Sequence, residues 1–295
     1  MRVNPNPMPD YLAALNVSRE AEQEAMAEMS SGRRVNRPSD DPAASAILVD
    51  NHDRTTLTTR YLTSLGLLQS QWQTADSTLG SIETALTRAL SLGVEGANGT
   101  LSDADRTAIV GELQGIQDQL LSLANTEFQG RYLFAGTNTS TVPFAKDAAQ
   151  PSGIRYDGNS GVNTVEVGEG LQLAVNQPGS QLFTAAGKNM FQGMSDLIQA
   201  MQSNSGFDSA INSIRASFDY ISAQRVFYGN TMNQAQAQST YLNNAKLQLS
   251  QQENTLAGAD VEAAASNLVN SENSINATLS AIGRFSQMNL FDFLK

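Results

Sequence analysis

Apolar residues recur at alternating steps of four and three residues between Phe207 and Leu256, and the positions between them hold mainly Asn, Gln, Ser and Ala. A seven-residue repeat kept for about seven heptads predicts one long helix with a narrow apolar seam. Such a seam is stable only against other helices that carry the same repeat. The rest of the chain must therefore supply partner helices.

The strongest partner is a second long helix, which we expect to begin at Ala43 and to end at the Gly-rich breaker 96–99. Its seam runs from Tyr61 to Ala89 without a polar interruption. Ser102 is a typical N-cap for a third helix that continues to about Phe128. These seams predict an antiparallel bundle of long helices.

From Gly130 the hydrophobic period changes from helical to alternating, and Gly and Asn become frequent. The alternation predicts short strands at 131–135, 154–156, 164–167 and 171–175, with a hairpin turn at 157–159. A weak helix is expected over Met190–Met201. This stretch should form a small β unit inserted between helices.

The two terminal helices have weaker seams. The first should start after Pro9, with Asp10 as N-cap, and should bury Met8, Leu12, Leu15, Met26 and Met29; Arg19 and Glu22 interrupt its seam. The last should be capped by Asp260 and should bury Val261, Leu268, Ile275 and Ile282, with Ala265 and Leu279 between them; Glu272 and Ser286 interrupt it. Both helices should be marginal alone and should lie alongside each other.

The expected fold is therefore mainly α: an elongated antiparallel helical bundle or coiled coil, built from both the N- and C-terminal segments, with a small inserted β domain. The expected domains are a terminal coiled coil from 1–45 with 256–295, a helical rod from 46–130 with 190–255, and the β domain from 131–189.

Charge and composition exclude several classes of function. The net charge of −11 argues against nucleic acid or an anionic membrane surface as a partner. The absence of cysteine excludes disulfides and thiolate chemistry. No apolar run approaches the roughly 18 residues of a membrane span, and the proline-rich first residues do not form a cleavable signal peptide.

An enzyme is the main alternative from another class, but the residues for a catalytic or metal site are lacking. His52 is the only histidine, with no second His or any Cys to complete a site. The pair Asp40 and Asp41 precedes Pro42, and such acids near a helix start are typically caps. Trp72, on an apolar seam, should be core. We therefore expect no catalytic residue, no metal and no cofactor.

Three stretches resemble the flagellin superfamily over essentially the whole chain. Residues 30–47, SSGRRVNRPSDDPAASAI, are similar to its N-terminal signature. The others are Asn125-Thr126 with Gly130–Thr137, and Gly258–Val261 with the ending Asn289–Leu294. Within the superfamily these stretches resemble the hook–filament junction proteins more than filament flagellins. The N-terminal prolines depart from the family pattern and leave the start of the first helix open.

This resemblance implies a non-enzymatic structural adaptor that joins the hook, through hook-associated protein 1, to the flagellin filament. It implies a terminal coiled coil in the inner tube, a rod outside it and a β domain outermost. It also implies export of the unfolded chain through the flagellar type III apparatus to an extracellular flagellum. The implied partners are further copies of the chain in a ring or helical array, hook-associated protein 1, flagellin and an export chaperone. The alternatives are a flagellin-type filament subunit and, more remotely, a secreted coiled-coil adhesin.

The candidate assembly interface combines the turn after the first helix with the last helix and the chain end. Its arginines are either a solvated turn or an ion-paired contact with acids of a neighbouring subunit. The predicted residues are Arg33, Arg34, Arg37, Asp40, Asp41, Val261, Leu268, Ile275, Ile282, Leu290, Phe291 and Leu294.

Overall fold

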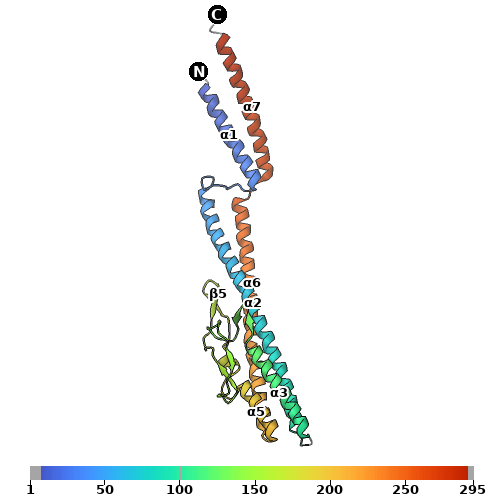
Figure 1. Cartoon of the computed structure of the whole chain (residues 1–295). Helices are drawn as coiled ribbons and strands as arrows, with labels where there is room; N and C mark the ends of the chain where they lie inside the picture. The colour runs from blue at the N-terminus through green and yellow to red at the C-terminus, as the bar shows by residue number, and fades with distance from the viewer. Residues whose placement is uncertain (1–7, 100, 292–295) are drawn as a thin grey trace. The chain divides into compact units, whose positions relative to one another are not determined.

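The structure is a computed structural model that describes residues 8–99 and 101–291, with side chains described up to residue 284 (Figure 1). The chain divides into two compact units. Unit 1 consists of Met1–Leu57 with Asn244–Lys295, and unit 2 of Thr58–Asn243. Two long helices, α2 (Pro42–Gly96) and α6 (Phe207–Ala257), contribute residues to both units.

In unit 1, α1 (Met8–Ser31) packs antiparallel against α7 (Val261–Phe291), so that the start of α1 and the end of α7 lie at the same end of the pair (Figure 1). The helix α1 already includes Met8 and Pro9 where the described residues begin, so the expected start after Pro9 is wrong; a proline is tolerated near the start of a helix. Asp10 therefore lies inside the first turn and not at the cap. Gly32, with a φ of 67°, follows the last residue of α1, as a left-handed glycine at a helix end commonly does.

In unit 2, α2 and α6 pack antiparallel, as their seams predicted. Gln69 of α2 is bonded to Gln236 of α6, whereas Gly93, farther along α2, faces Ile211. The two seams share one core in which Trp72, Leu79 and Tyr228 are fully buried. The prediction that Trp72 is core is confirmed.

The third helix of unit 2, α3 (Asp103–Ala124), starts with a capping box in which Ser102 and Asp105 bond each other's backbone N–H. It ends four residues before the expected Phe128. The backbone turns back at Gln129 and Gly130, both with positive φ, and a strand pair forms there instead of a further helical turn. The expected weak helix, α5 (Met190–Ser203), packs against α3 and buries most of one face.

The β segment consists of three two-stranded antiparallel sheets. These are β1 (Glu127–Phe128) with β2 (Arg131–Tyr132), β3 (Phe144–Lys146) with β4 (Ile154–Tyr156), and β5 (Thr164–Gly168) with β6 (Leu171–Ala174). A short helix, α4 (Gly179–Leu182), follows.

The expected hairpin turn at 157–159 is wrong, because β4 pairs backward with β3, a strand that the alternation did not reveal. Residues 157–159 do not join two paired strands. Instead, the Asn159 N–H donates to the Ala135 carbonyl at 3.1 Å, and the Tyr156 hydroxyl donates to the Asn159 carbonyl at 2.8 Å. These bonds tie the end of β4 to the strand region after Gly130.

The β segment is joined to the helices of unit 2 through a shared core and directed hydrogen bonds. The rings of Phe134, Phe144 and Phe183 pack edge to face within it. The indole N–H of Trp72 donates to the Val175 carbonyl at 2.8 Å. The predicted fold class, mainly α with a small β insertion, is confirmed, whereas the division into three domains remains a prediction. Within the described ranges, no helix combines the length and apolarity that crossing a membrane requires.

Candidate assembly interface

The turn after α1, residues 32–41, forms a junction loop that binds the break between α6 and α7. The Arg34 N–H donates to the Ala257 carbonyl at 2.7 Å, and the Ala259 N–H donates to the Gly32 carbonyl at 3.0 Å. Two chain segments that are more than two hundred residues apart in sequence are thus held by a short antiparallel bridge. This bridge places the start of α7 beside the end of α1.

Two of the three arginines in the loop bind acceptors of their own chain. Arg33 pairs with Glu253 of α6. The Arg34 guanidinium donates to the Asp41 carboxylate at 3.2 Å and to the Leu256 carbonyl at 2.9 Å. In the part of the chain that the structure describes, the side chain of Arg37 forms no ion pair. The ion pairs are solvent-exposed, so they orient the loop more than they stabilise it.

The two aspartates of the loop have different roles. Asp41 caps α2, because its carboxylate accepts from the Ala44 N–H at 3.0 Å, as expected. Asp40 instead accepts from the N–H groups of Arg37 and Asn36, at 2.8 and 3.0 Å, and so closes the loop on itself. Backbone N–H donors lower the pKa of both carboxyls from 3.8, and Arg34 adds to the effect on Asp41.

A small apolar cluster lies beneath the loop. Val35 is buried against Ala44 and Leu48 of α2 and Ala257 of α6. The sequence predicted only a polar turn here, because one valine among charged residues carries no periodic signal. The cluster explains why the stretch between the arginines and the aspartates folds onto the helices.

The α1–α7 pair buries few large side chains. Its innermost residues are Leu15 and Ala25 of α1 with Ala264 and Ser271 of α7. On α7 the Leu268–Ile275–Ile282 line is half-buried as predicted, but the second line passes through Ser271 and not through Glu272. On α1, Leu12 and Met26 are exposed where the prediction had them in the seam. Small residues allow close helix contact but supply little apolar area.

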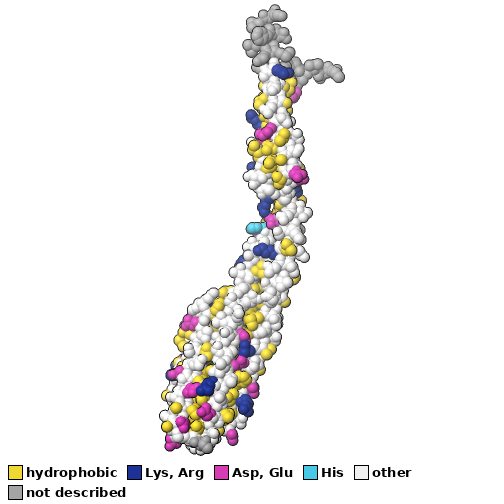
Figure 2. All heavy atoms as spheres, turned by 90° about the vertical axis from the view of Figure 1, so that its right-hand side faces the viewer, with side chains coloured by type: hydrophobic (Ala, Val, Ile, Leu, Met, Phe, Trp, Pro, Cys, Tyr) yellow, Lys and Arg dark blue, Asp and Glu magenta, His cyan; other side chains and the backbone are white. Residues whose placement is uncertain are grey.

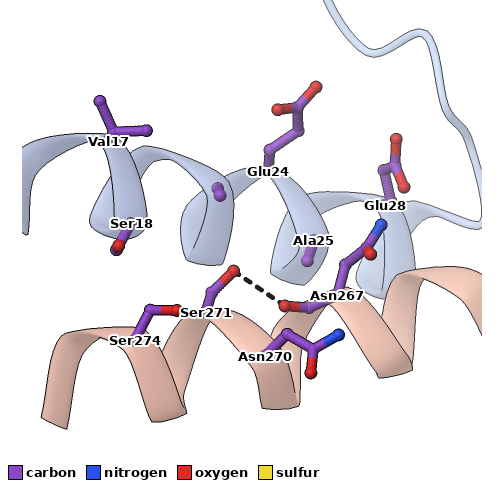
Figure 3. A pocket seen from close by; sticks show the side chains of 10 residues that line it. Val17, Ser18, Glu24, Ala25, Glu28, Asn267, Asn270, Ser271 and Ser274 are labelled. Atoms are coloured by element: carbon purple, nitrogen blue, oxygen red, sulfur yellow. Dashed lines mark hydrogen bonds between the residues drawn. The ribbon is translucent and has the colours of Figure 1, made fainter. Parts of the chain in front are cut away.

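One side of the α1–α7 pair is a polar groove of about 400 Å³ (Figure 3). In Figure 3 the two helices run side by side, with small hydroxyl and amide side chains between them. The Ser271 hydroxyl donates to the Asn267 carbonyl of its own helix at 2.8 Å, so it forms no bond across the groove. The groove is lined by Val17, Ser18, Ala21, Glu24, Ala25, Glu28, Asn267, Asn270, Ser271 and Ser274.

The opposite side of the same pair holds large apolar residues together with the charged Arg19 and Glu272. At 100° per residue, Leu12 and Met26 lie on the flank of α1 away from the groove, and Val261 and Leu279 lie on the corresponding flank of α7. All four are about half exposed. Figure 2 shows hydrophobic side chains gathered on the surface of unit 1. On this side the pair therefore exposes several large apolar side chains that its own chain leaves uncovered.

The predicted interface residues lie partly together. Val261, Leu268 and Ile275 follow one another along α7 from its first residue, and the arginines and aspartates lie in the junction loop beside that start of α7. Leu290 and Phe291 belong to α7, but their side chains lie outside the description. Leu294 lies outside the described residues.

The described residues hold no group of three or more His, Cys, Asp or Glu with metal-binding geometry, and His52 is exposed on α2. What the arrangement offers is a protein-binding surface: exposed apolar side chains on one flank, a polar groove, and Arg37, which forms no ion pair among the described residues. Surfaces of this kind are covered by neighbouring proteins.

Comparisons with known proteins agree with this description. Residues 10–139 match the family model of the bacterial flagellin N-terminal helical region. Flagellar hook-associated protein 3 of Escherichia coli K12 is 25% identical over 294 residues, which cover 91% of each chain. The protein of that name from Salmonella typhimurium is 35% identical over 163 residues, which cover 55% of this chain and 50% of the relative.

A solved structure, the flagellar junction protein FlgL from Legionella pneumophila, superposes with a TM-score of 0.58 at 15% identity, over 72% of this chain and all of that one. At that identity the likeness concerns the fold alone. Together, these matches show that residues 10–139 resemble the flagellin N-terminal helical region and that the chain is similar to flagellar hook-associated protein 3.

Proposed function

We propose that this chain is a structural adaptor of the bacterial flagellum that joins the hook, through hook-associated protein 1, to the flagellin filament. The observation that carries the proposal is the match to hook-associated protein 3 over 91% of both chains. A match of that extent reaches well beyond residues 10–139 and so concerns most of the chain.

The α1–α7 pair supports a role in self-assembly. Its seam contains Ser271 and small alanines, and its apolar flank is open to solvent. An isolated pair of this composition gains little from folding, so neighbouring copies should stabilise it. We infer that copies contact one another through the flank at Val261 and Leu268 and through the junction loop at Arg37, in a heterologous array that closes into a ring or helix.

The same proposal assigns roles to the three predicted domains. The terminal segments 1–45 and 256–295 line the inner tube, the helical segments 46–130 and 190–255 form the rod, and 131–189 faces outward. Export as an unfolded chain through the type III apparatus, with a flagellar chaperone, is part of the proposal. The absence of cysteine is compatible with it, because no disulfide would hinder an unfolded passage.

Deletion of the gene tests the adaptor role. We expect complete hooks, flagellin released into the medium and no filament, because the filament lacks its attachment. Reintroducing the intact gene should restore filaments. Filaments of normal length and number in the deletion strain would contradict the proposal.

Immunogold labelling of intact flagella separates the adaptor from the filament-subunit alternative. An adaptor should be labelled only at the end of the hook. Label distributed along the filament would instead favour a flagellin-type subunit.

A further inference from the structure

The helices of unit 2 carry a long stretch without charge. Residues 61–75 of α2 and 226–243 of α6 contain no Asp, Glu, Lys or Arg, in a chain of which 16% of residues are charged. The two stretches lie at the same level of the antiparallel pair, since Gln69 of one is bonded to Gln236 of the other. We call these two stretches the neutral belt. Figure 2 shows mainly white and yellow surface here and more blue and magenta toward α5.

One side of the neutral belt is covered by the β segment. The Tyr61 hydroxyl is bonded to Glu166 at 3.1 Å, and the Gln238 amide donates to the Val167 carbonyl at 3.1 Å. The uncovered sides are the faces of α2 and α6 that point away from their common seam. Because the seam lies between the helices, these two faces point in opposite directions.

Each uncovered face holds apolar side chains among neutral polar ones. On α2, Leu67 is 47% exposed, and farther along the same helix Ser70 and Thr74 line a groove of about 440 Å³ together with Phe128. On α6, Val226 is 58% and Tyr241 66% exposed. The stripe on α6 repeats at helical spacing through Val226, Asn230, Asn233, Ala237 and Tyr241.

We propose that the neutral belt is a lateral contact between copies of this chain, in which the α6 face of one copy packs on the α2 face of the next. The cores of protein interfaces are depleted in charged residues and enriched in tyrosine. Each copy carries a net charge of −11, so copies repel wherever their acidic surfaces meet. The belt lets two like-charged chains come into contact without desolvating a charge.

A second copy fits this surface better than a charged partner does, since a charged partner would leave its own charges desolvated and unpaired. Two different faces on opposite sides make the contact heterologous, so that each copy can bind two neighbours in a row. This inference deepens the proposed function and rests on it, because the rows are expected within the flagellum.

Cysteine cross-linking tests the contact, because the natural chain has no cysteine to confuse the result. Ser70→Cys is combined in turn with Asn230→Cys, Asn233→Cys, Ala237→Cys or Tyr241→Cys. The four positions sample different shifts, along the helix axis, of the α6 face of one copy relative to the α2 face of the next. A disulfide needs Cα atoms within about 7 Å. Axes of packed helices are 8–10 Å apart, so outward-facing positions of one pair lie beyond that reach and intrachain bonds do not form.

Flagella isolated from strains with these variants are oxidised and probed for this chain. We expect a ladder of dimers, trimers and larger species in at least one double variant, and no ladder from Ser70→Cys combined with Gln202→Cys, a control on α5. Dimers from Ser70→Cys alone would indicate that two α2 faces meet, and would overturn the heterologous contact. Monomers in all four double variants, or cross-links only to a chain of another mass, would overturn the inference.

The outcomes also separate this inference from the proposed function. Chain present in the flagella without a ladder contradicts only the neutral belt, whereas absence of the unmodified chain from flagella contradicts the proposed function itself. Asn233→Glu provides a second measurement: it should reduce the amount of chain retained in flagella several-fold, while Asn233→Gln should leave it unchanged. Equal retention of both variants would also overturn the inference. Circular dichroism of each purified variant confirms that it folds.

Discussion

Arg225 lies on the mainly apolar seam of α6, and its neighbours in unit 2 explain why it can lie there. Its guanidinium forms two bonds to the Asp76 carboxylate, at 2.9 and 3.0 Å, and one to Glu83 at 2.6 Å. Both acids belong to α2 and are one heptad apart. They raise the pKa of Arg225, Asp76 above all. Because a shift by one heptad would separate the arginine from one of the acids, this cluster favours a single register of α2 and α6.

Replacement of Arg225 by methionine should destabilise unit 2. The change leaves Asp76 and Glu83 partly buried without a countercharge, and we expect a loss of roughly 2 kcal/mol in the free energy of unfolding. Urea denaturation followed by circular dichroism measures it. Arg215→Met is the matched control, since Arg215 is an exposed arginine of the same helix.

Neutralising both acids in the Arg225→Met variant, by Asp76→Asn and Glu83→Gln, should recover most of that loss, because the unpaired charges are then gone. An Arg225→Met variant as stable as the Arg215→Met control would show that the cluster contributes little to stability.

At the scale of elements, the sequence predicted the long helices closely and the β segment only in part. The seams of α2 and α6 carry many apolar residues at one period, so their existence and antiparallel packing follow from the pattern. The strand β3 and the pairing of β4 were missed, because β3 is held by bonds such as those between the Asn125 side chain and the Phe144 backbone, which no periodicity encodes. Val35 was missed for the same reason.

The seams of α1 and α7 were predicted less accurately, and their composition explains the error. Where alanine and serine occupy the contact, as Ala264 and Ser271 do, apolar residues such as Leu12 lie on the flank instead. A pattern analysis that assigns the largest apolar residues to the seam then misplaces it by one position. The weakness of the seam stays a prediction, and in the structure its basis is the small Ala264 and Ser271 at the contact, because Arg19 and Glu272 lie outside it.

Replacement of Ser271 by leucine should stabilise the α1–α7 pair by about 1–2 kcal/mol, because it adds apolar area at a buried seam position that borders an open groove. The Ser271 hydroxyl bonds only to its own helix, so no contact between helices is lost. Hydrogen exchange of amides in α1 and α7, at low protein concentration, measures the gain in opening free energy.

Ser280→Leu is the matched control for this variant. Ser280 forms the same bond to the carbonyl four residues earlier, but it is exposed on α7. Slower exchange in both variants would show that helix propensity and not seam packing is responsible. Unchanged exchange in Ser271→Leu would contradict the idea that the seam is incomplete.

At the scale of the whole molecule, the loop arginines that are paired within the chain differ from the surfaces that we propose to contact other copies. Arg33 and Arg34 are bonded to their own chain, and the neutral belt carries no charge at all. In the described part of the chain Arg37 is the one loop arginine without an ion pair of its own. It is therefore the residue at which the two interpretations of the arginine group, solvated turn or contact with a neighbour, can be distinguished.

Charge reversal at Arg37 should weaken assembly and leave the isolated chain unchanged. If Arg37 pairs with an acid of a neighbouring copy, Arg37→Glu replaces an attraction by a repulsion, and retention in flagella should fall several-fold at low salt and less at high salt. Its helicity and melting curve should match those of the natural chain. Arg34→Glu is the contrasting variant: it removes the bonds to Asp41 and Leu256 and should reduce both assembly and the stability of unit 1. Retention of Arg37→Glu at the natural level would assign this arginine to solvent, and the contacts between copies would then depend on the flank of α7 and on the neutral belt.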